Sequence, residues 1–171
     1  MIEILPYSEV NGCRTLPDTA LIYIWDRLEK DGTIKTVFSE CDITVAQQFV
    51  ELCKDNRNLP AFVIVDGKLG GIGWVNGVQK DRAFSHYAFF KEHWGKKTIE
   101  MAKALMAYWF RPEFPFYMLI GQTPTWNRRA VKFLERIGWT IAGELPATPM
   151  GQGIVISYCT RERFNGRQER R

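Results

Sequence analysis

The fold is decided by the stretch Thr123-Pro-Thr-Trp-Asn-Arg-Arg-Ala-Val-Lys-Phe-Leu-Glu-Arg-Ile-Gly-Trp-Thr-Ile-Ala-Gly143, which predicts a turn, a short amphipathic helix and a strand. Apolar side chains recur at helical spacing, namely Ala130, Phe133, Leu134 and Ile137. Charged side chains take the opposite face, namely Arg128, Arg129, Lys132, Glu135 and Arg136. Thr125 or Asn127 can cap the start of this helix, and Gly138 suits a left-handed stop at its end.

A second segment upstream has the features of a phosphate-binding loop. It reads His93-Trp-Gly-Lys-Lys-Thr-Ile-Glu100, follows an aromatic, strand-like stretch over residues 83–90 and opens a predicted helix over residues 97–110. A helix that starts after a glycine loop offers free backbone N–H groups and the positive end of the helix dipole. Both features favour an anionic group at this point.

The remaining elements alternate between strands and helices. Helices are predicted over residues 18–30 and 44–55. Strands are predicted over residues 2–6, 33–38, 61–65, 69–75, 116–120 and 154–159. The turn Asp66-Gly67-Lys68 predicts a hairpin, and a bulge or close strand approach explains the run Gly70-Gly71-Ile72-Gly73 better than a phosphate site does. This mixed order argues for an α/β sandwich around one mostly antiparallel sheet.

The two segments together resemble the GNAT acyltransferases, which transfer an acyl group, usually acetyl, from coenzyme A to an amine. The pattern Asn127-x-x-Ala130-x-x-Phe133-Leu134-x-x-x-Gly138-Trp139 resembles the last helix-to-strand motif of that family. The segment Trp94-Gly95-Lys96 resembles the pyrophosphate loop of the branch that acetylates protein N-termini. The resemblance covers residues 61–159 and implies a GNAT-like sheet of six to seven strands flanked by about four helices.

The chain departs from the family at the loop, which usually reads Gln/Arg-x-x-Gly-x-Gly/Ala. Aligned through Trp94-Gly95-Lys96, Lys97 and Ile99 occupy the small-residue positions. With Gly95 as the first glycine instead, Glu92 takes the Gln/Arg position and Lys97 the last small-residue position. Those glycines let the backbone approach the pyrophosphate without a Cβ in the way. A lysine still pairs with phosphate as a point charge, so coenzyme binding is weakened rather than excluded. The family tyrosine that protonates the leaving thiolate would lie at Leu134.

The resemblance also implies site residues. Acyl transfer needs a base or water chain for the amine and hydrogen-bond donors for the oxyanion. By resemblance, the backbone near Phe89 meets the acyl carbonyl, and the expected catalytic groups are His86, Tyr87 and Glu92. Acetyl-CoA is the expected co-substrate, and the residues expected to bind it are Phe89, Phe90, Trp94, Gly95, Lys96, Lys97, Thr98, Asn127 and Arg129.

Structural roles compete with these functional ones. General grounds favour a half-buried His86 satisfied by a neighbour over a catalytic His86. Glu92 suits a solvated loop charge, and Arg129 suits a charged outer helix face. Asn127 has two equal interpretations, a contact with the coenzyme and a helix cap.

The composition of the 171 residues is that of one globular domain, expected over residues 1–160. Scattered cysteines and two histidines predict reduced thiols and no metal site, the cysteines being Cys13, Cys41, Cys53 and Cys159. No signal peptide or membrane span is predicted, so we expect a cytoplasmic protein without membrane partners. Residues 161–171 form a basic tail with five arginines and two glutamates, expected to be a solvated, frayed terminus.

Three functions remain open. The first is an acyl-CoA-dependent N-acyltransferase acting on a protein or small-molecule amine, and the family favours it slightly. The second is a catalytically lapsed scaffold, because the chain is also similar to GNAT-like head and internal virion proteins of bacteriophages; its partner would be another protein or a second copy, in the host cytoplasm or the virion. The third is nucleic-acid binding through the basic tail, by non-specific phosphate contacts.

Overall fold

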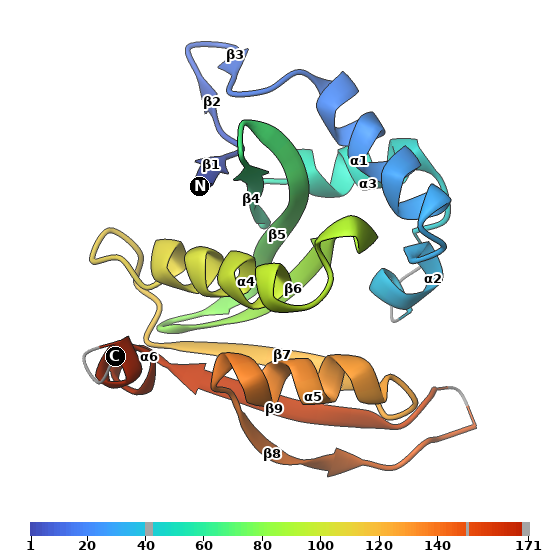
Figure 1. Ribbon diagram of the computed structural model, residues 1–171, viewed down its shortest axis with the longest axis vertical. Helices are drawn as coiled ribbons and strands as arrows, with labels where there is room; N and C mark the ends of the chain where they lie inside the picture. The colour runs from blue at the N-terminus through green and yellow to red at the C-terminus, as the bar shows by residue number, and fades with distance from the viewer. Residues whose placement is uncertain (40–42, 150, 169–171) are drawn as a thin grey trace. The chain divides into compact units, whose positions relative to one another are not determined.

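The computed structural model describes residues 1–39, 43–149 and 151–168. Seven strands form one sheet in the order β1-β4-β5-β6-β7-β9-β8 (Figure 1). Their bounds are β1 (Ile2–Pro6), β4 (Leu59–Val65), β5 (Lys68–Gln79), β6 (Arg82–Phe89), β7 (Met118–Pro124), β8 (Thr140–Leu145) and β9 (Ile154–Thr160). The pairs β1–β4, β4–β5, β7–β9 and β8–β9 are antiparallel, and β6–β7 is parallel. The predicted mostly antiparallel sheet is confirmed.

The helices lie between these strands in the chain. Their bounds are α1 (Asp18–Lys30), α2 (Ile34–Val37), α3 (Ala46–Lys54), α4 (Lys96–Trp109), α5 (Arg128–Ile137) and α6 (Arg161–Gln168). A 3-10 turn, η1 (Lys91–His93), precedes α4, and a small hairpin joins β2 (Glu9–Val10) to β3 (Cys13–Arg14). The predicted bounds of β1 and α1 are confirmed to the residue.

The chain forms two compact units. Unit 1 comprises Met1–Asn76 and His86–Leu105, and unit 2 comprises Gly77–Ser85 and Met106–Arg171. One domain over residues 1–160 stays a prediction. None of the helices in the described ranges has the length and apolar character that a membrane crossing needs.

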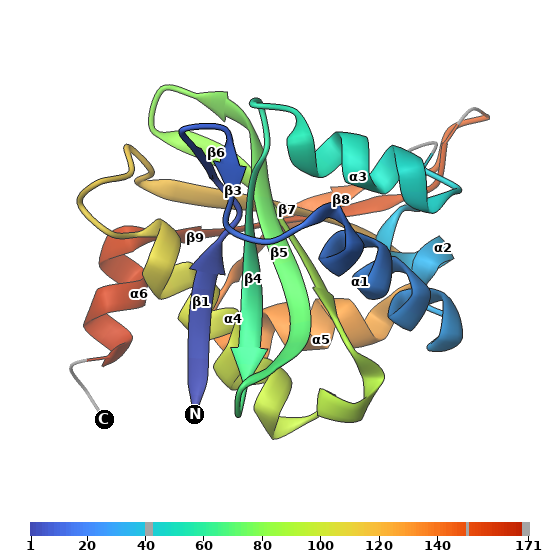
Figure 2. The same ribbon diagram turned by 90° about the horizontal axis from the view of Figure 1, so that it is seen from above.

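The core of unit 1 lies where α1 and α3 pack beside the strands (Figure 2). The apolar stripe of α1 is fully buried at Leu21, Ile24 and Leu28, because these residues recur on one helical face. Aromatic rings continue the same core: Trp25 stacks on Phe38, and Phe38 stacks on Trp74. Because Trp74 lies in β5, the aromatic core extends to the sheet.

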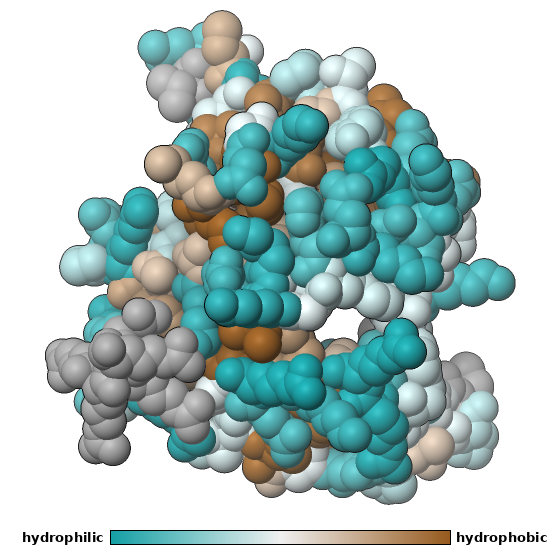
Figure 3. Space-filling model, in the orientation of Figure 1, coloured by the Kyte–Doolittle hydropathy of each residue, from teal (hydrophilic) through white to brown (hydrophobic). Residues whose placement is uncertain are grey.

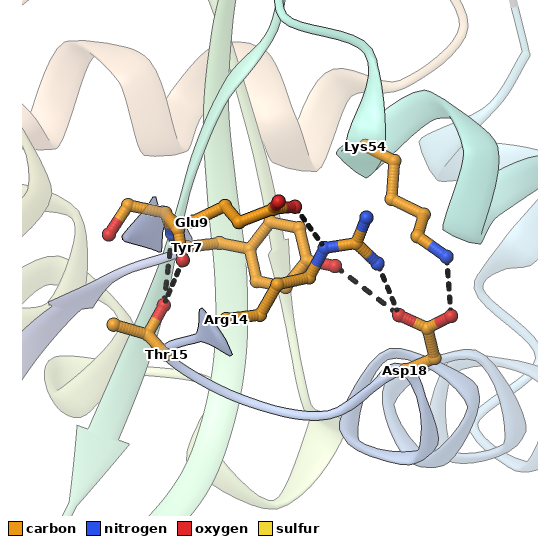
Figure 4. A network of polar contacts seen from close by, with 7 residues as sticks. Tyr7, Glu9, Arg14, Thr15, Asp18 and Lys54 are labelled. Carbon is orange, nitrogen blue, oxygen red and sulfur yellow. Dashed lines mark hydrogen bonds and ion pairs between the residues drawn. The ribbon is translucent and has the colours of Figure 1, made fainter. Parts of the chain in front are cut away.

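A polar network fixes the start of α1 (Figure 4). Arg14 donates to Glu9 at 3.1 Å and to Asp18 at 3.0 Å, and Lys54 also donates to Asp18. The hydrogen bond from Lys54 contributes most to lowering the pKa of the Asp18 carboxyl, and the one from Arg14 lowers it further. The network ties the β2–β3 hairpin and the end of α3 to the first residue of α1.

The β4–β5 hairpin confirms two predictions. Asp66 and Gly67 have φ values of 50° and 78°, which suit a two-residue hairpin turn of the primed type. The pairing register shifts between Val63 and Ile64, so the glycine run contains a bulge. A Cβ at Gly71 would lie 2.4 Å from the Ala88 carbonyl oxygen, so the next strand also approaches closely.

In unit 2, α5 packs its apolar stripe inward and turns into β8. Leu134 and Ile137 are buried, and the α5 surface is hydrophilic (Figure 3). Gly138 has φ 101° and ends the helix in the left-handed conformation, as predicted. Nearby, the Trp139 indole donates to the Met106 sulfur at 3.3 Å.

The predicted strand over residues 33–38 is wrong, because these residues include the single helical turn α2. Gly32 takes φ 68°, and the Thr33 amide donates back to the Leu28 carbonyl at 2.9 Å. The chain therefore curls at the end of α1 and carries Phe38 into the core. The alternating polarity of this segment reflects a short turn rather than a strand.

The prediction of a frayed tail from residue 161 is wrong for α6. Phe164 is buried and lies 5.6 Å from the Phe110 ring. Arg161 donates to the Phe114 carbonyl at 2.9 Å, and Arg163 donates to the Gly138 carbonyl at 3.0 Å. The buried Phe164 and the two hydrogen-bonding arginines thus hold α6 in place although its composition is mostly polar. Residues 169–171 lie outside the described residues.

Three of the four cysteines lie in the described part of the chain. Cys13 is exposed, whereas Cys53 and Cys159 are buried. Burial raises the pKa of the Cys53 thiol, which keeps it protonated and unreactive. Cys41 lies outside the described residues.

Candidate functional site

The candidate phosphate loop of unit 1 runs from the end of β6 to the first turn of α4. Its own side chains close it: the Trp94 indole donates to the Phe89 carbonyl at 3.3 Å, and the Thr98 hydroxyl donates to the His93 carbonyl at 2.6 Å. Gly95 has φ 114°, a conformation that favours glycine, and its missing Cβ would meet no atom within 4 Å. The loop therefore leaves open space at Gly95, directly before α4.

The electrostatics of this loop favour an anion. The first N–H groups of an α-helix have no partner within the helix, and the dipole adds positive charge there. The first turn of α4 contains Lys96 and Lys97 and no acidic residue. Lys97 lies 3.4 Å from Glu100, and the Lys91 ammonium lies 5.7 Å from the centre of the Trp94 ring.

Phe90 has a structural place in the loop. Its ring is fully buried in the core of unit 1, and its amide donates to the Gly70 carbonyl at 3.0 Å. Its carbonyl accepts from the His93 amide at 3.0 Å. Both backbone groups and the side chain are thus engaged within the chain, so Phe90 supports the loop from below.

His86 is held as a neutral ring. It stacks on Trp74 with ring centres 4.8 Å apart, and its Nε2 lies 3.1 Å from the Asn76 side-chain oxygen. That oxygen only accepts, so Nε2 carries the hydrogen and Nδ1 keeps the lone pair. Burial lowers the pKa of His86 to about 4, so the ring is uncharged at neutral pH. The arrangement is that of a histidine satisfied by a neighbour, and its catalytic role stays a prediction.

The three residues predicted to be catalytic lie in different surroundings. Successive residues of a strand point to opposite faces, so Tyr87 projects away from the Trp74 face that holds His86. The Tyr87 ring instead lies 5.8 Å from Phe89. Glu92 lies on η1 and pairs with Arg27 at 2.9 Å. The chain therefore does not gather these groups into one acid–base cluster.

In unit 2, Asn127 caps α5. Its side-chain oxygen accepts from the Ala130 amide at 3.2 Å, which confirms the cap. Arg128 and Arg129 follow in the first turn, are exposed, and have no acidic residue beside them in that turn. Two cations at the positive end of a helix dipole are unfavourable unless an anion offsets them. Leu134 is buried and has no proton to give.

Several residues that shape the loop were missed from the sequence. Arg27 pairs with Glu92, Asp31 accepts from the Lys91 amide at 2.7 Å, and Asn76 holds His86. None of them lies in a motif, and their spacing to the loop gives no signal in one sequence. In the described ranges, no three His, Cys, Asp or Glu side chains are grouped as a metal ion requires.

Solved structures show where this fold recurs. The spermidine N-acetyltransferase from Vibrio cholerae, solved with CoA and spermine, matches with a TM-score of 0.74 and 17% identity over 96% of this chain and 98% of that one. The ribosomal L7/L12 alpha-N-protein acetyltransferase RimL matches with a TM-score of 0.71 and 12% identity over 94% of this chain and 95% of that one. At such identities the likeness shows the fold alone.

Sequence comparison supplies the family. No curated protein matches the chain at a significant level. The family model described as an acetyltransferase (GNAT) domain matches residues 25–140. This region is more than half of the chain and contains the candidate phosphate loop and the cap of α5. The chain therefore belongs to the GNAT acetyltransferase family.

Proposed function

We propose that this protein is an N-acyltransferase that uses acetyl-CoA to acetylate an amine. The observation that carries the proposal is the open, acid-free turn at Gly95, Lys96 and Lys97 that starts α4 in a chain of the GNAT family. A side chain at Gly95 would occupy the space that a phosphate needs, and the adjoining lysines supply positive charge.

The residues of unit 1 have separate tasks in this proposal. The amide groups from Gly95 to Thr98 bind pyrophosphate oxygens, while Lys96 and Lys97 neutralise their charge. The hydrogen bond from Thr98 to His93 keeps the loop in shape for this contact. When bound, acetyl-CoA supplies the acyl group as a thioester.

In unit 2, Asn127 and Arg129 are the proposed coenzyme contacts. The exposed Arg129 offers a guanidinium to phosphate, and Asn127 keeps its amide N–H₂ available while its oxygen caps α5. The unbalanced positive charge in the first turn of α5 supports an anion there.

The chemistry proposed for the amine follows from the state of His86. A ring with a pKa of about 4 is a weak general base at neutral pH. In this proposal His86 therefore orients the amine or a water molecule through Nδ1. Tyr87 stays a candidate for the same task, whereas the Glu92 carboxylate is engaged with Arg27. By resemblance, Leu134 stands where the family has an acid and has no proton to give, so a proton for the thiolate would have to come from solvent or from the amine. The names of the two structural relatives give a polyamine and a protein α-amine as their acceptors. Both acceptor classes suit this proposal.

Isothermal titration with acetyl-CoA tests the proposal. Saturable binding at micromolar strength is expected, and a Gly95→Val variant should lose it because its backbone is strained and the cradle is filled. A Gly166→Ala variant is the control, since a Cβ there would meet no atom within 4 Å. Release of free thiol in the presence of spermidine or an N-terminal peptide then identifies the acceptor class. No binding by the wild-type protein would contradict the proposal and favour the lapsed-scaffold alternative.

A further inference from the structure

The last turn of α1 contacts the candidate phosphate loop at two points. Arg27 donates to the Glu92 carboxylate at 2.9 Å, and the Asp31 carboxylate accepts from the Lys91 amide at 2.7 Å. Arg27 and Asp31 are four residues apart, so the end of α1 presents both on one side. The two contacts join residues that are 65 and 60 positions apart in the sequence.

Arg27 is held on several sides. Its guanidinium lies 4.6 Å from the centre of the Phe90 ring and 5.9 Å from that of Tyr23. It also donates to the Tyr23 hydroxyl at 3.0 Å. An exposed ion pair alone contributes little to stability, but a guanidinium fixed by two rings and two oxygens has a defined direction. The pair with Glu92 therefore transmits the position of α1 to η1.

Asp31 acts on the backbone of the same segment. It holds the Lys91 amide, while the Gly70 carbonyl holds the Phe90 amide from the strand side. The single turn η1 then carries the chain to Trp94, whose amide donates to the Lys91 carbonyl at 3.1 Å. The entry into Gly95 is thus anchored on both sides before the open turn begins.

We propose that Arg27 and Asp31 are positioning residues for the coenzyme loop, and that Glu92 serves as the loop's partner for Arg27 rather than as a base. The inference rests on the proposed function. The family loop has several glycines, whereas this one has Gly95 alone between Trp94 and Ile99. A loop with bulkier residues has fewer ways to adapt to the pyrophosphate, so an outside anchor decides its shape.

The test compares Arg27→Gln, Asp31→Asn and Glu92→Gln by titration with acetyl-CoA and by kcat and KM for acetyl transfer. Arg27→Gln should weaken coenzyme binding about tenfold, the equivalent of one lost charge-assisted hydrogen bond, whereas Asp31→Asn and Glu92→Gln keep a neutral acceptor and should weaken it about threefold. KM for the coenzyme should rise while kcat changes little, because none of these groups touches the acceptor. Arg27→Lys should recover only part of the affinity, since an ammonium lacks the planar fork.

Arg14→Gln is the matched control. Arg14, like Arg27, donates to a carboxylate, but it does so at the opposite end of α1, about 18 Å away along a helix of this length. This variant should lose similar stability and keep wild-type coenzyme affinity.

The outcomes separate the two proposals. Wild-type affinity in Arg27→Gln and Glu92→Gln, with binding intact in the parent, overturns this inference and leaves the proposed function standing. A fall in kcat without a rise in KM for Glu92→Gln also overturns it, because that result makes Glu92 catalytic. No binding by the parent protein overturns both. If Arg27→Gln does not fold, the exposed Glu92→Gln variant decides the question alone.

Discussion

The starts of α4 and α5 are held by different kinds of contact. The turn before α4 depends on partners far along the chain, since Lys91 is held by Asp31 and Glu92 by Arg27. In the turn before α5, the Asn127 backbone amide donates to the Pro124 carbonyl at 2.9 Å and the Asn127 side chain caps Ala130, while the Thr125 amide donates to the Gly153 carbonyl at 2.9 Å and the Trp126 indole donates to Gln152. The entry to α4 is therefore anchored by two side chains from the end of α1, whereas the first turn of α5 is capped by the residue directly before it.

This difference predicts different responses to substitution. A change at a distant partner should disturb the first turn without altering any residue in it. The capped start of α5 should respond most to changes at Asn127 itself. Substitutions near β6 test the first statement, and substitutions at the cap of α5 test the second.

The largest effect is expected from Gly71→Ala, which disturbs the strand that leads to the first turn. The new Cβ would lie 2.4 Å from the Ala88 carbonyl oxygen and 2.9 Å from the Phe89 Cα, so β5 and β6 must separate. We expect the free energy of unfolding to fall by about 3 kcal/mol, as for an overpacked core. Urea denaturation measures it.

Gly143→Ala is the control for Gly71→Ala. A Cβ at Gly143 would meet no atom within 4 Å, and this residue also lies in a strand. Its stability should stay within about 0.5 kcal/mol of the parent protein. Equal stability of the two variants would mean that β5 and β6 do not approach as closely as described.

The next effect is a loss of stability in acid through His86. Burial lowers the pKa of the folded ring to about 4, from an ordinary value of 6.5. The unfolded chain therefore takes up a proton more readily between these values, and stability falls as pH drops through that window. The loss should reach about 2 kcal/mol between pH 7 and pH 5.

Denaturation of the parent and of His86→Gln at both pH values isolates this contribution. The variant has no ring to protonate, so its stability should change by about 2 kcal/mol less. His93→Gln, which keeps the ring at 86, should still show the acid-side loss. An unchanged pH dependence in His86→Gln would show that the ring is not held neutral by burial.

Much of the fold follows from local patterns in the sequence. The bounds of the strand Ile2–Pro6 and of the helix Asp18–Lys30 could be predicted because the pattern of apolar residues begins and ends with each element. The strand predicted over residues 33–38 was wrong because the single helical turn α2 is too short to show a helical period. Segment 161–168 misled because Phe164 is its only apolar anchor.

The local structure around two candidate residues could be predicted, namely the glycine turn before α4 and the cap at the start of α5. Gly95 and Asn127 carry their signals in neighbouring residues, a strand before one and an amphipathic helix after the other. His86 and Glu92 contact Asn76 and Arg27, and no spacing rule connects those pairs. A titratable residue therefore cannot be assigned a role until its distant partners are known.

The smallest effect concerns Asn127, where the helix cap and the proposed coenzyme contact can be separated. Asn127→Ala removes the cap and should lower the free energy of unfolding by about 1 kcal/mol, whereas Asn127→Ser keeps an acceptor for the Ala130 amide and should cost only a few tenths, about 0.3 kcal/mol. Asn127→Ser also removes the amide N–H₂ proposed to meet the coenzyme. Thermal denaturation and titration with acetyl-CoA should therefore disagree for this variant, with stability kept and affinity reduced. If affinity follows stability in both variants, Asn127 acts through the helix alone, and the second turn contributes shape rather than contact.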